Sequence, residues 1–170
     1  MAKEESHIIA AIVEHKPGVL YSVSNMFRRR GFNIESITVG PTEQGDLARM
    51  TITVNGDEKV IEQVIKQLNK LIDVVKVSRL DPASIVTREM ALVKVHTSDA
   101  RARSDIINYA SIFRARVVDV SPDTMMVEIT GDSDKINAFL DLMKPFGVRE
   151  MARTGITALS RGKKSVKIEE

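Results

Sequence analysis

Residues 8–20 read IIAAIVEHKPGVL, and this stretch decides the first half of the fold. Residues 8–13 are apolar at odd and even positions alike, which is typical of a short strand that is covered on both faces. Polar residues 14–16 interrupt the run, and Pro17 suits the first position of a helix because its missing N–H needs no partner there. Apolar residues then recur at three- and four-residue spacing over 19–27, so we expect a strand, a turn and an amphipathic helix.

The end of this helix and the segments after it complete a β-α-β-β-α-β order. Arginines at 28–30 fall in the last turn, where cations suit the helix dipole, and Gly31 is a suitable C-cap. The expected elements that follow are strands over 33–39, 47–55 and 74–80 and a helix that is capped by Asp57 and carries an apolar stripe from Ile61 to Ile72. This order is that of the ferredoxin-like fold.

The second half of the chain repeats this order. An offset of 75 residues maps Ile52 and Val54 onto Val127 and Ile129, and it maps Gly56-Asp57 onto Gly131-Asp132. The same offset maps the second helical stripe, Ile61, Val64, Ile65, Leu68 and Leu71, onto Ile136, Phe139, Leu140, Met143 and Phe146. The predicted fold class is therefore α+β, with two tandem ferredoxin-like βαββαβ domains. The expected organisation is a first domain over 1–80, a linker over 81–87, a second domain over 88–160 and a charged tail over 161–170.

Composition limits the possible functions. The chain has 170 residues, and its 25 Lys plus Arg against 23 Asp plus Glu give a net charge of only +2. Such a balance predicts no general attraction to nucleic acid. The first six residues are charged without an apolar signal core, and the apolar run at 8–13 is too short to cross a membrane, so a cytoplasmic protein is expected. Two domains of about 80 residues each would bury thin cores and gain stability from packing against a partner.

No catalytic or metal-binding pattern stands out. The chain has no cysteine, and His7, His15 and His96 are far apart in the sequence. It lacks the phosphate-loop, dinucleotide-binding and nucleophile-elbow motifs. The predicted strands also lack the aromatic residues that stack RNA bases in related folds. An enzyme of this fold would need clustered acid and base groups, which the sequence does not indicate.

Two stretches are candidate binding segments. At 14–20, free N–H groups at a helix N-terminus, with Gly18 allowing close approach, favour a carboxylate, and Val19 and Leu20 could receive an aliphatic side chain. The alternative is a plain strand–helix turn. The arginines at 28–30 could bind phosphate or could be a solvated helix end.

The same segments resemble a known family. The turn PGVL (17–20), the helix end FRRRGFNI (27–34) and the segments ESITV (35–39), RMTI (49–52) and QLNKLIDV (67–74) resemble the ACT domain of the acetolactate synthase small subunit. In the second half, REMALVKV (88–95), IFRA (112–115), ARTG (152–155) and LSRG (159–162) continue the likeness over nearly the whole chain.

The resemblance implies a non-catalytic regulatory subunit. Its partner would be the acetolactate synthase catalytic large subunit, which carries thiamine diphosphate, magnesium and FAD, so that this chain itself holds no cofactor. The small subunit would activate that enzyme and confer feedback inhibition by valine in branched-chain amino-acid biosynthesis. The alternative is a free-standing ACT-domain sensor acting on another enzyme or on transcription. The second domain could dimerise, contact the enzyme or relay the valine signal.

The resemblance also implies a site at a homodimer interface between ACT domains. Its expected effector-binding residues are His15, Pro17, Gly18, Val19 and Leu20 of one protomer and Asn33 and Ile34 of the other. The family often has Asn at the position of His15. Because histidine changes charge near about pH 6.5, we expect valine binding to depend on pH.

Overall fold

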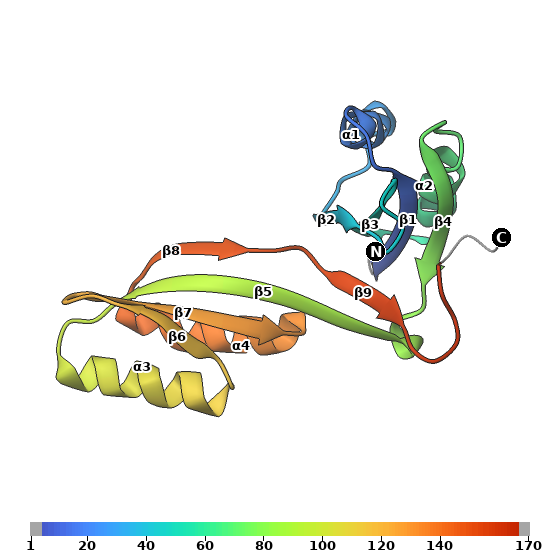
Figure 1. Cartoon of the computed structure of the whole chain (residues 1–170). Coiled ribbons are helices and arrows are strands. Elements are labelled where there is room, and N and C mark those ends of the chain that lie inside the picture. Colours follow the sequence, from blue (N-terminus) through green and yellow to red (C-terminus); the bar gives the residue numbers. More distant parts are fainter. Residues whose placement is uncertain (1–4, 167–170) are drawn as a thin grey trace. The chain divides into compact units, whose positions relative to one another are not determined.

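Both halves of the chain build the predicted order of elements in the computed structural model, which describes residues 5–166. The described chain divides into unit 1, residues 5–86 and 155–166, and unit 2, residues 87–154 (Figure 1). Each unit has an antiparallel sheet with two helices, so the predicted α+β class with tandem βαββαβ repeats is confirmed.

Unit 1 is built on a sheet in the order β2-β3-β1-β4. Its elements are β1 (Glu5–Glu14), α1 (Val19–Arg30), β2 (Ser36–Pro41), β3 (Leu47–Gly56), α2 (Glu58–Leu68) and β4 (Val74–Leu80), followed by a 3-10 turn, η1 (Pro82–Ser84). All three strand pairs are antiparallel. The central position of β1 explains its continuous apolar sequence.

Both faces of β1 are covered, as the sequence predicted. On one face Ile9, Ala11 and Val13 pack against residues of α1 and α2. On the other face Ile8, Ala10 and Ile12 pack in a second cluster. That second cluster includes Ala158 and Val166 from the C-terminal segment, which returns to unit 1 as β9 (Thr157–Ser160).

Unit 2 repeats the arrangement with the order β6-β7-β5-β8. Its elements are β5 (Ile85–His96), of which the first two residues belong to unit 1, α3 (Ala100–Ile112), β6 (Arg116–Val120), β7 (Thr124–Gly131), α4 (Ser133–Met143), η2 (Lys144–Phe146) and β8 (Val148–Arg153). The repeat predicted from the sequence is also seen in the packing: Ile61 and Ile136, which the offset of 75 residues relates, are each buried in the core of their own unit. Asp57 and Asp132 are the matching N-caps, and each accepts a hydrogen bond of 2.9 Å from a backbone N–H three residues later.

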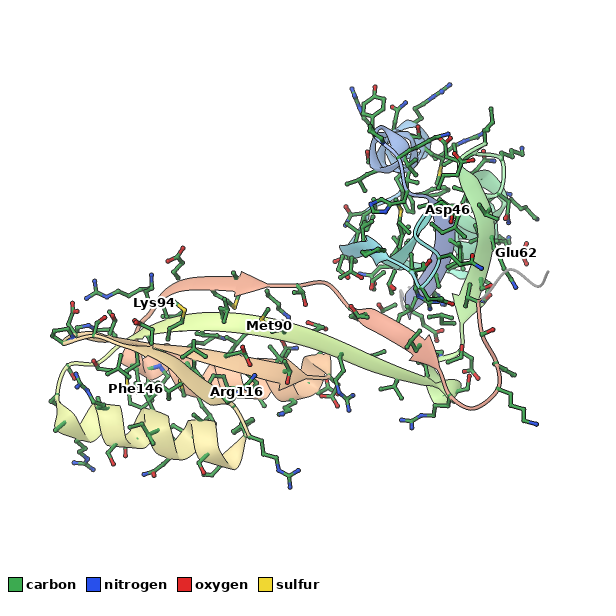
Figure 2. The ribbon with its side chains drawn as sticks, viewed as in Figure 1. Asp46, Glu62, Met90, Lys94, Arg116 and Phe146 are labelled. Carbon is green, nitrogen blue, oxygen red and sulfur yellow. The ribbon has the colours of Figure 1, made fainter. Side chains whose placement is uncertain are left out.

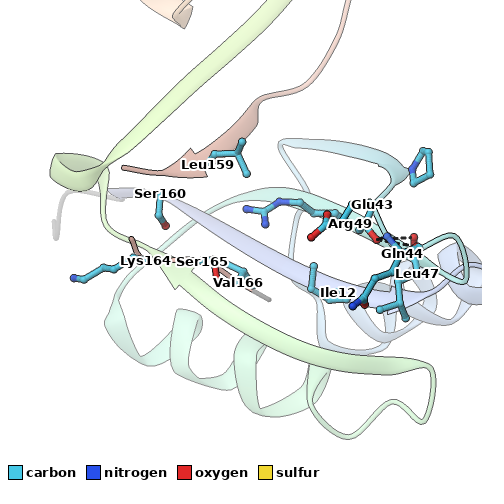
Figure 3. A pocket seen from close by; sticks show the side chains of 12 residues that line it. Ile12, Glu43, Gln44, Leu47, Arg49, Leu159, Ser160, Lys164, Ser165 and Val166 are labelled. Carbon is cyan, nitrogen blue, oxygen red and sulfur yellow. Dashed lines mark hydrogen bonds between the residues drawn. The ribbon is translucent and has the colours of Figure 1, made fainter. Parts of the chain in front are cut away.

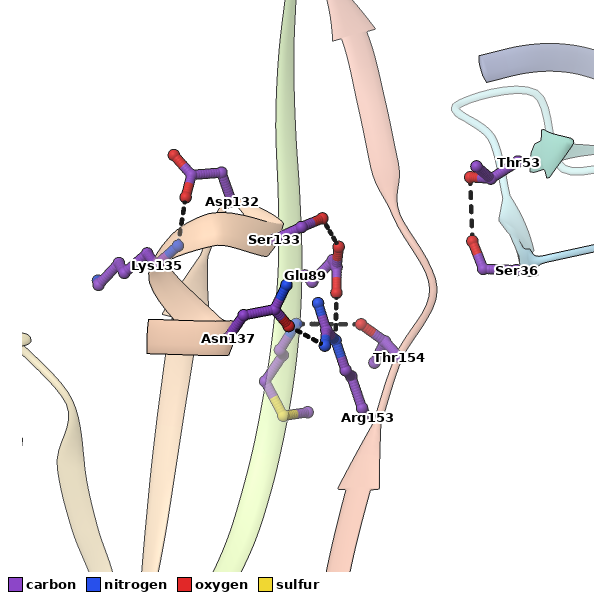
Figure 4. Close-up of polar contacts among 10 residues, drawn as sticks. Ser36, Thr53, Glu89, Asp132, Ser133, Lys135, Asn137, Arg153 and Thr154 are labelled. Carbon is purple, nitrogen blue, oxygen red and sulfur yellow. Dashed lines mark hydrogen bonds and ion pairs between the residues drawn. The ribbon is translucent and has the colours of Figure 1, made fainter. Parts of the chain in front are cut away.

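An ion pair between a buried glutamate and a partly exposed arginine ties α4 to two strands of unit 2 (Figure 4). The Glu89 carboxylate is buried, and it accepts a hydrogen bond of 2.5 Å from Nε of Arg153 and another from the hydroxyl of Ser133. Arg153 also donates to Oδ1 of Asn137 at 2.7 Å. These contacts connect β5, β8 and α4 at one place.

Several element boundaries differ from those predicted. Gly18 adopts φ +91° at the N-cap of α1, so Pro17 precedes the helix instead of opening it. Helix α2 ends at Leu68, and Ile72 lies beyond it with 94% of its surface exposed, so Ile72 does not belong to the apolar stripe. Strand β2 begins at Ser36, three residues later than expected.

The division into units also differs from the expected domain limits. Strand β5 begins at Ile85, inside the segment 81–87 that was expected as a linker. Residues 155–160, expected with the second domain, belong to unit 1 because Ile156 and Ala158 cover the second face of its sheet. Of the expected tail, 161–166 also belongs to unit 1, and residues 167–170 lie outside the described residues. No helix among residues 5–166 has the length and apolar character of a membrane span.

Candidate functional site

The turn between β1 and α1 presents an open helix N-terminus. Gly18 is the N-cap in a left-handed conformation, and a Cβ added there would meet nothing within 4 Å. The first N–H groups of a helix have no partner inside the helix. Among residues 5–166 no side chain caps this end, and the first turn of α1 has no acidic residue. The turn therefore offers backbone donors and a positive dipole end to an anion.

The turn is held in place by contacts with distant parts of unit 1. The N–H of Glu14 donates to the carbonyl of Asp73 at 2.9 Å, and that of His15 donates to the carbonyl of Asp46 at 2.8 Å (Asp46 is labelled in Figure 2). Lys16 forms ion pairs with Glu14 and, at 2.7 Å, with Asp73. Hydrogen bonds to Asp73 and then Glu14 raise the pKa of Lys16. The sequence did not indicate these supports because Asp46 and Asp73 are remote from the turn along the chain.

The predicted residues of this turn fall into two groups. His15, Pro17, Gly18 and Leu20 are exposed, and Leu20 keeps 49% of its surface open. The side chain of Val19 is only 3% exposed and packs in the core, so its backbone alone faces the turn. Leu20 and Pro17 thus offer exposed apolar surface beside the helix N-terminus.

Asn33 and Ile34 lie at the opposite end of α1. Asn33 is exposed and donates from Nδ2 to Oε1 of Glu35 at 2.7 Å, whereas Ile34 is half-buried against the core. The 12 residues of α1 separate them from Gly18, which corresponds to about 18 Å at the rise of an α-helix. A single chain therefore does not bring the two predicted parts of the site together.

The arginines at the end of α1 lie beside a groove between α1 and α2. Arg29, Arg30 and Lys70 contribute positive charge to this groove, which has a volume of about 610 Å³. Arg30 donates to Oε1 of Gln67 at 3.1 Å, which links the two helices. Gly31 caps the helix as predicted, with its N–H directed to the carbonyls of Phe27 and Arg28.

The described residues offer no cluster of ligands for a metal. Among residues 5–166, no group of three or more His, Asp or Glu side chains converges as a metal site would require. The β1–α1 turn combines a helix N-terminus with exposed apolar surface, and this combination suits the binding of a small carboxylate.

Two protein families match the chain. Residues 9–76 match the family described as AHAS small subunit-like ACT domain. Residues 88–162 match the family described as small subunit of acetolactate synthase. The first match includes the β1–α1 turn together with Asn33 and Ile34.

Individual proteins are similar over nearly the full length. A probable acetolactate synthase small subunit from Methanothermobacter thermautotrophicus is 59% identical over 95% of this chain and 96% of its own length. An acetolactate synthase small subunit from Aquifex aeolicus is 51% identical over 96% of this chain and 85% of its own. The crystal structure of the acetolactate synthase small subunit from Thermotoga maritima aligns with a TM-score of 0.88 and 45% identity, covering 94% of this chain and 99% of that one.

Proposed function

This chain belongs to the acetolactate synthase small-subunit family, and on this premise we propose that it is a non-catalytic regulator that binds and activates the catalytic large subunit. The observation that carries the proposal is the similarity of both units, over nearly the full length, to small subunits. Thiamine diphosphate, magnesium and FAD then reside on the catalytic partner. This chain would bind the effector and transmit its effect to the catalytic subunit.

The proposed effector is valine, bound at the β1–α1 turn. Its carboxylate would accept hydrogen bonds from the N–H groups at the start of α1, next to Gly18. The exposed side chain of Leu20 supplies apolar surface for the isopropyl group. The uncapped helix end and the absence of acidic residues from its first turn, among residues 5–166, support this assignment.

The site would be completed by a second copy of the chain. Because α1 separates Gly18 from Asn33 and Ile34 in one protomer, these two residues would have to come from the other. Strand β2 begins two residues after Ile34 and is an edge strand, with Val39 47% exposed. An edge strand has unpaired backbone groups that a second strand can join. Homodimerisation along β2 would place Asn33 and Ile34 at the interface, where occupancy and interface geometry are coupled.

Reconstitution tests the proposal. The full chain is mixed with the thiamine-dependent synthase from the same genome, and acetolactate formation is measured with and without valine. We expect co-elution, a higher rate in the complex and inhibition by valine. A chain that neither co-elutes nor activates would contradict the proposal. Valine binding without co-elution would favour the alternative, a free-standing ACT-domain sensor.

A further inference from the structure

A cavity of about 380 Å³ lies on the face of the unit 1 sheet that the helices leave open (Figure 3). Its walls come from β1, from the loop between β2 and β3, and from the C-terminal segment 159–166. Side chains alternate along a strand, so Ile12 and Arg49 face this cavity while Val13 and Met50 face the helices. The volume is within the range of small-molecule sites.

Arg49 brings a partly unsatisfied guanidinium into this cavity. Its Nη2 donates to the carbonyl of Ala158 at 2.8 Å. Its Nε is buried and has no hydrogen-bond partner among residues 5–166. Burial lowers the pKa of Arg49, an effect that the Glu43 carboxylate opposes, but an arginine stays charged in proteins. A buried donor of a cation that lacks an acceptor is a natural partner for an anion.

The remaining lining has both charge and apolar surface. Lys164 adds a second cation and Glu43 adds one carboxylate, so the ionisable lining groups carry a net charge of +1. Ile12, Leu47 and Val166 are buried and supply an apolar floor. Leu159 is 59% exposed and lines the cavity from β9.

We propose that this cavity binds a small monocarboxylate with a branched aliphatic tail. The carboxylate would accept hydrogen bonds from Arg49 and pair with Lys164, while the tail would pack on Ile12, Leu47 and Val166. A net charge of +1 matches one carboxylate and disfavours a dicarboxylate. The cavity is distinct from the β1–α1 turn because none of residues 14–20 lines it.

The probe for this site is 4-methylpentanoate, titrated into the full chain by calorimetry. We expect saturable binding of one molecule per chain, and no binding of 4-methylpentan-1-ol, which has the same tail without the carboxylate. Binding of 4-methylpentanoate supports the proposal. Failure of 4-methylpentanoate to bind overturns it.

Two variants of Leu159 give a matched comparison. Leu159→Glu adds a negative charge beside the proposed carboxylate, and we expect at least about a tenfold loss of affinity. Leu159→Gln has a similar size without the charge, and its affinity should stay within about threefold of the native protein. Equal binding by these two variants would place the carboxylate elsewhere and overturn the proposal.

Two further variants separate this cavity from the candidate effector site. Arg49→Gln should abolish binding of 4-methylpentanoate, with circular dichroism confirming that the fold survives loss of the contact to Ala158. Gly18→Asp alters the β1–α1 turn and should leave this binding intact. The opposite pattern, with binding lost in Gly18→Asp and kept in Arg49→Gln, would contradict the assignment to the cavity. Failure of valine regulation in the reconstituted enzyme would leave these measurements unaffected.

Discussion

Gly18 is the residue on which the candidate effector site depends. We expect Gly18→Asp to abolish valine binding, because it places a carboxylate where the carboxylate of valine would lie. The added Cβ meets nothing within 4 Å, so the change brings only the strain of a left-handed backbone, about 1–2 kcal/mol. Calorimetry with valine measures the loss, and association with the catalytic subunit should persist. Gly18→Asn is the control, since it has the same shape without charge and should still bind valine.

His15 is exposed beside the helix N-terminus of the candidate effector site. We expect His15→Asp to weaken valine binding at least about tenfold, because a carboxylate there would repel that of valine. His15→Asn is the uncharged control and should bind valine within about threefold of the native protein. Calorimetry measures the affinities, and equal binding by the two variants would refute this placement of His15.

Glu89 is a buried carboxylate, and we expect its pairing with Arg153 to contribute to the stability of unit 2. Its side chain is 6% exposed, and it holds Arg153 at 2.5 Å. We expect Glu89→Gln to lower the free energy of unfolding of unit 2 by about 2–3 kcal/mol. This is less than for a fully buried pair because a quarter of Arg153 reaches solvent. Urea unfolding followed by NMR signals of unit 2 measures the effect.

Glu150 provides the matched control for that experiment. It pairs with Lys94 at 3.0 Å in the same sheet, but its side chain is 72% exposed. Glu150→Gln should therefore change stability by less than about 1 kcal/mol. Similar losses in the two variants would show that burial does not decide the strength of these pairs.

At the scale of elements, the C-terminal segment is the second cover of the unit 1 sheet. Ala158 is 1% exposed on β9 and packs with Ile8, Ala10 and Ile12. We expect Ala158→Asp to destabilise unit 1 by about 3 kcal/mol or more, because it buries a charge among apolar side chains. Thr157→Asp puts the same charge on the exposed neighbour and should cost less than about 0.5 kcal/mol. Thermal unfolding compares them, and equal melting temperatures would argue against β9 as a cover.

The elements that sequence predicted well carry local signals. The alternation of residue types over 47–55 predicted β3. Capping residues predicted helix ends, as at Gly31 and Asp57. The sequence did not indicate that Ala158 and Val166 cover β1, because that contact joins residues far apart along the chain. For the same reason, the sequence predicted neither the ion pair between Lys16 and Asp73 nor the cavity around Arg49. Local sequence patterns predict individual helices and strands, whereas contacts between distant elements can be identified only in the folded structure.

At the scale of the whole molecule, we expect the two edge strands of the unit 1 sheet, β2 and β4, to differ in their part in dimerisation. Val39 on β2 and Val75 on β4 are 47% and 46% exposed. We expect Val39→Lys to shift the protein to a monomer and to weaken valine binding, because a lysine on an edge strand opposes pairing with another strand. Val75→Lys is the matched control and should remain dimeric. Light scattering after size exclusion reports the mass, and a monomer from Val75→Lys alone would assign the interface to β4.

The return of the chain to unit 1 at residue 155 also sets an order of events during synthesis. All of unit 2 is synthesised before Ala158 and Val166, which complete the second face of β1, have been made. At ordinary rates of translation that face stays uncovered for on the order of ten seconds after β4 is made. The nascent chain thus carries an open apolar strand surface while its second half is synthesised. Ile8, Ala10 and Ile12 are the side chains that lack their cover until the C-terminal segment has been made.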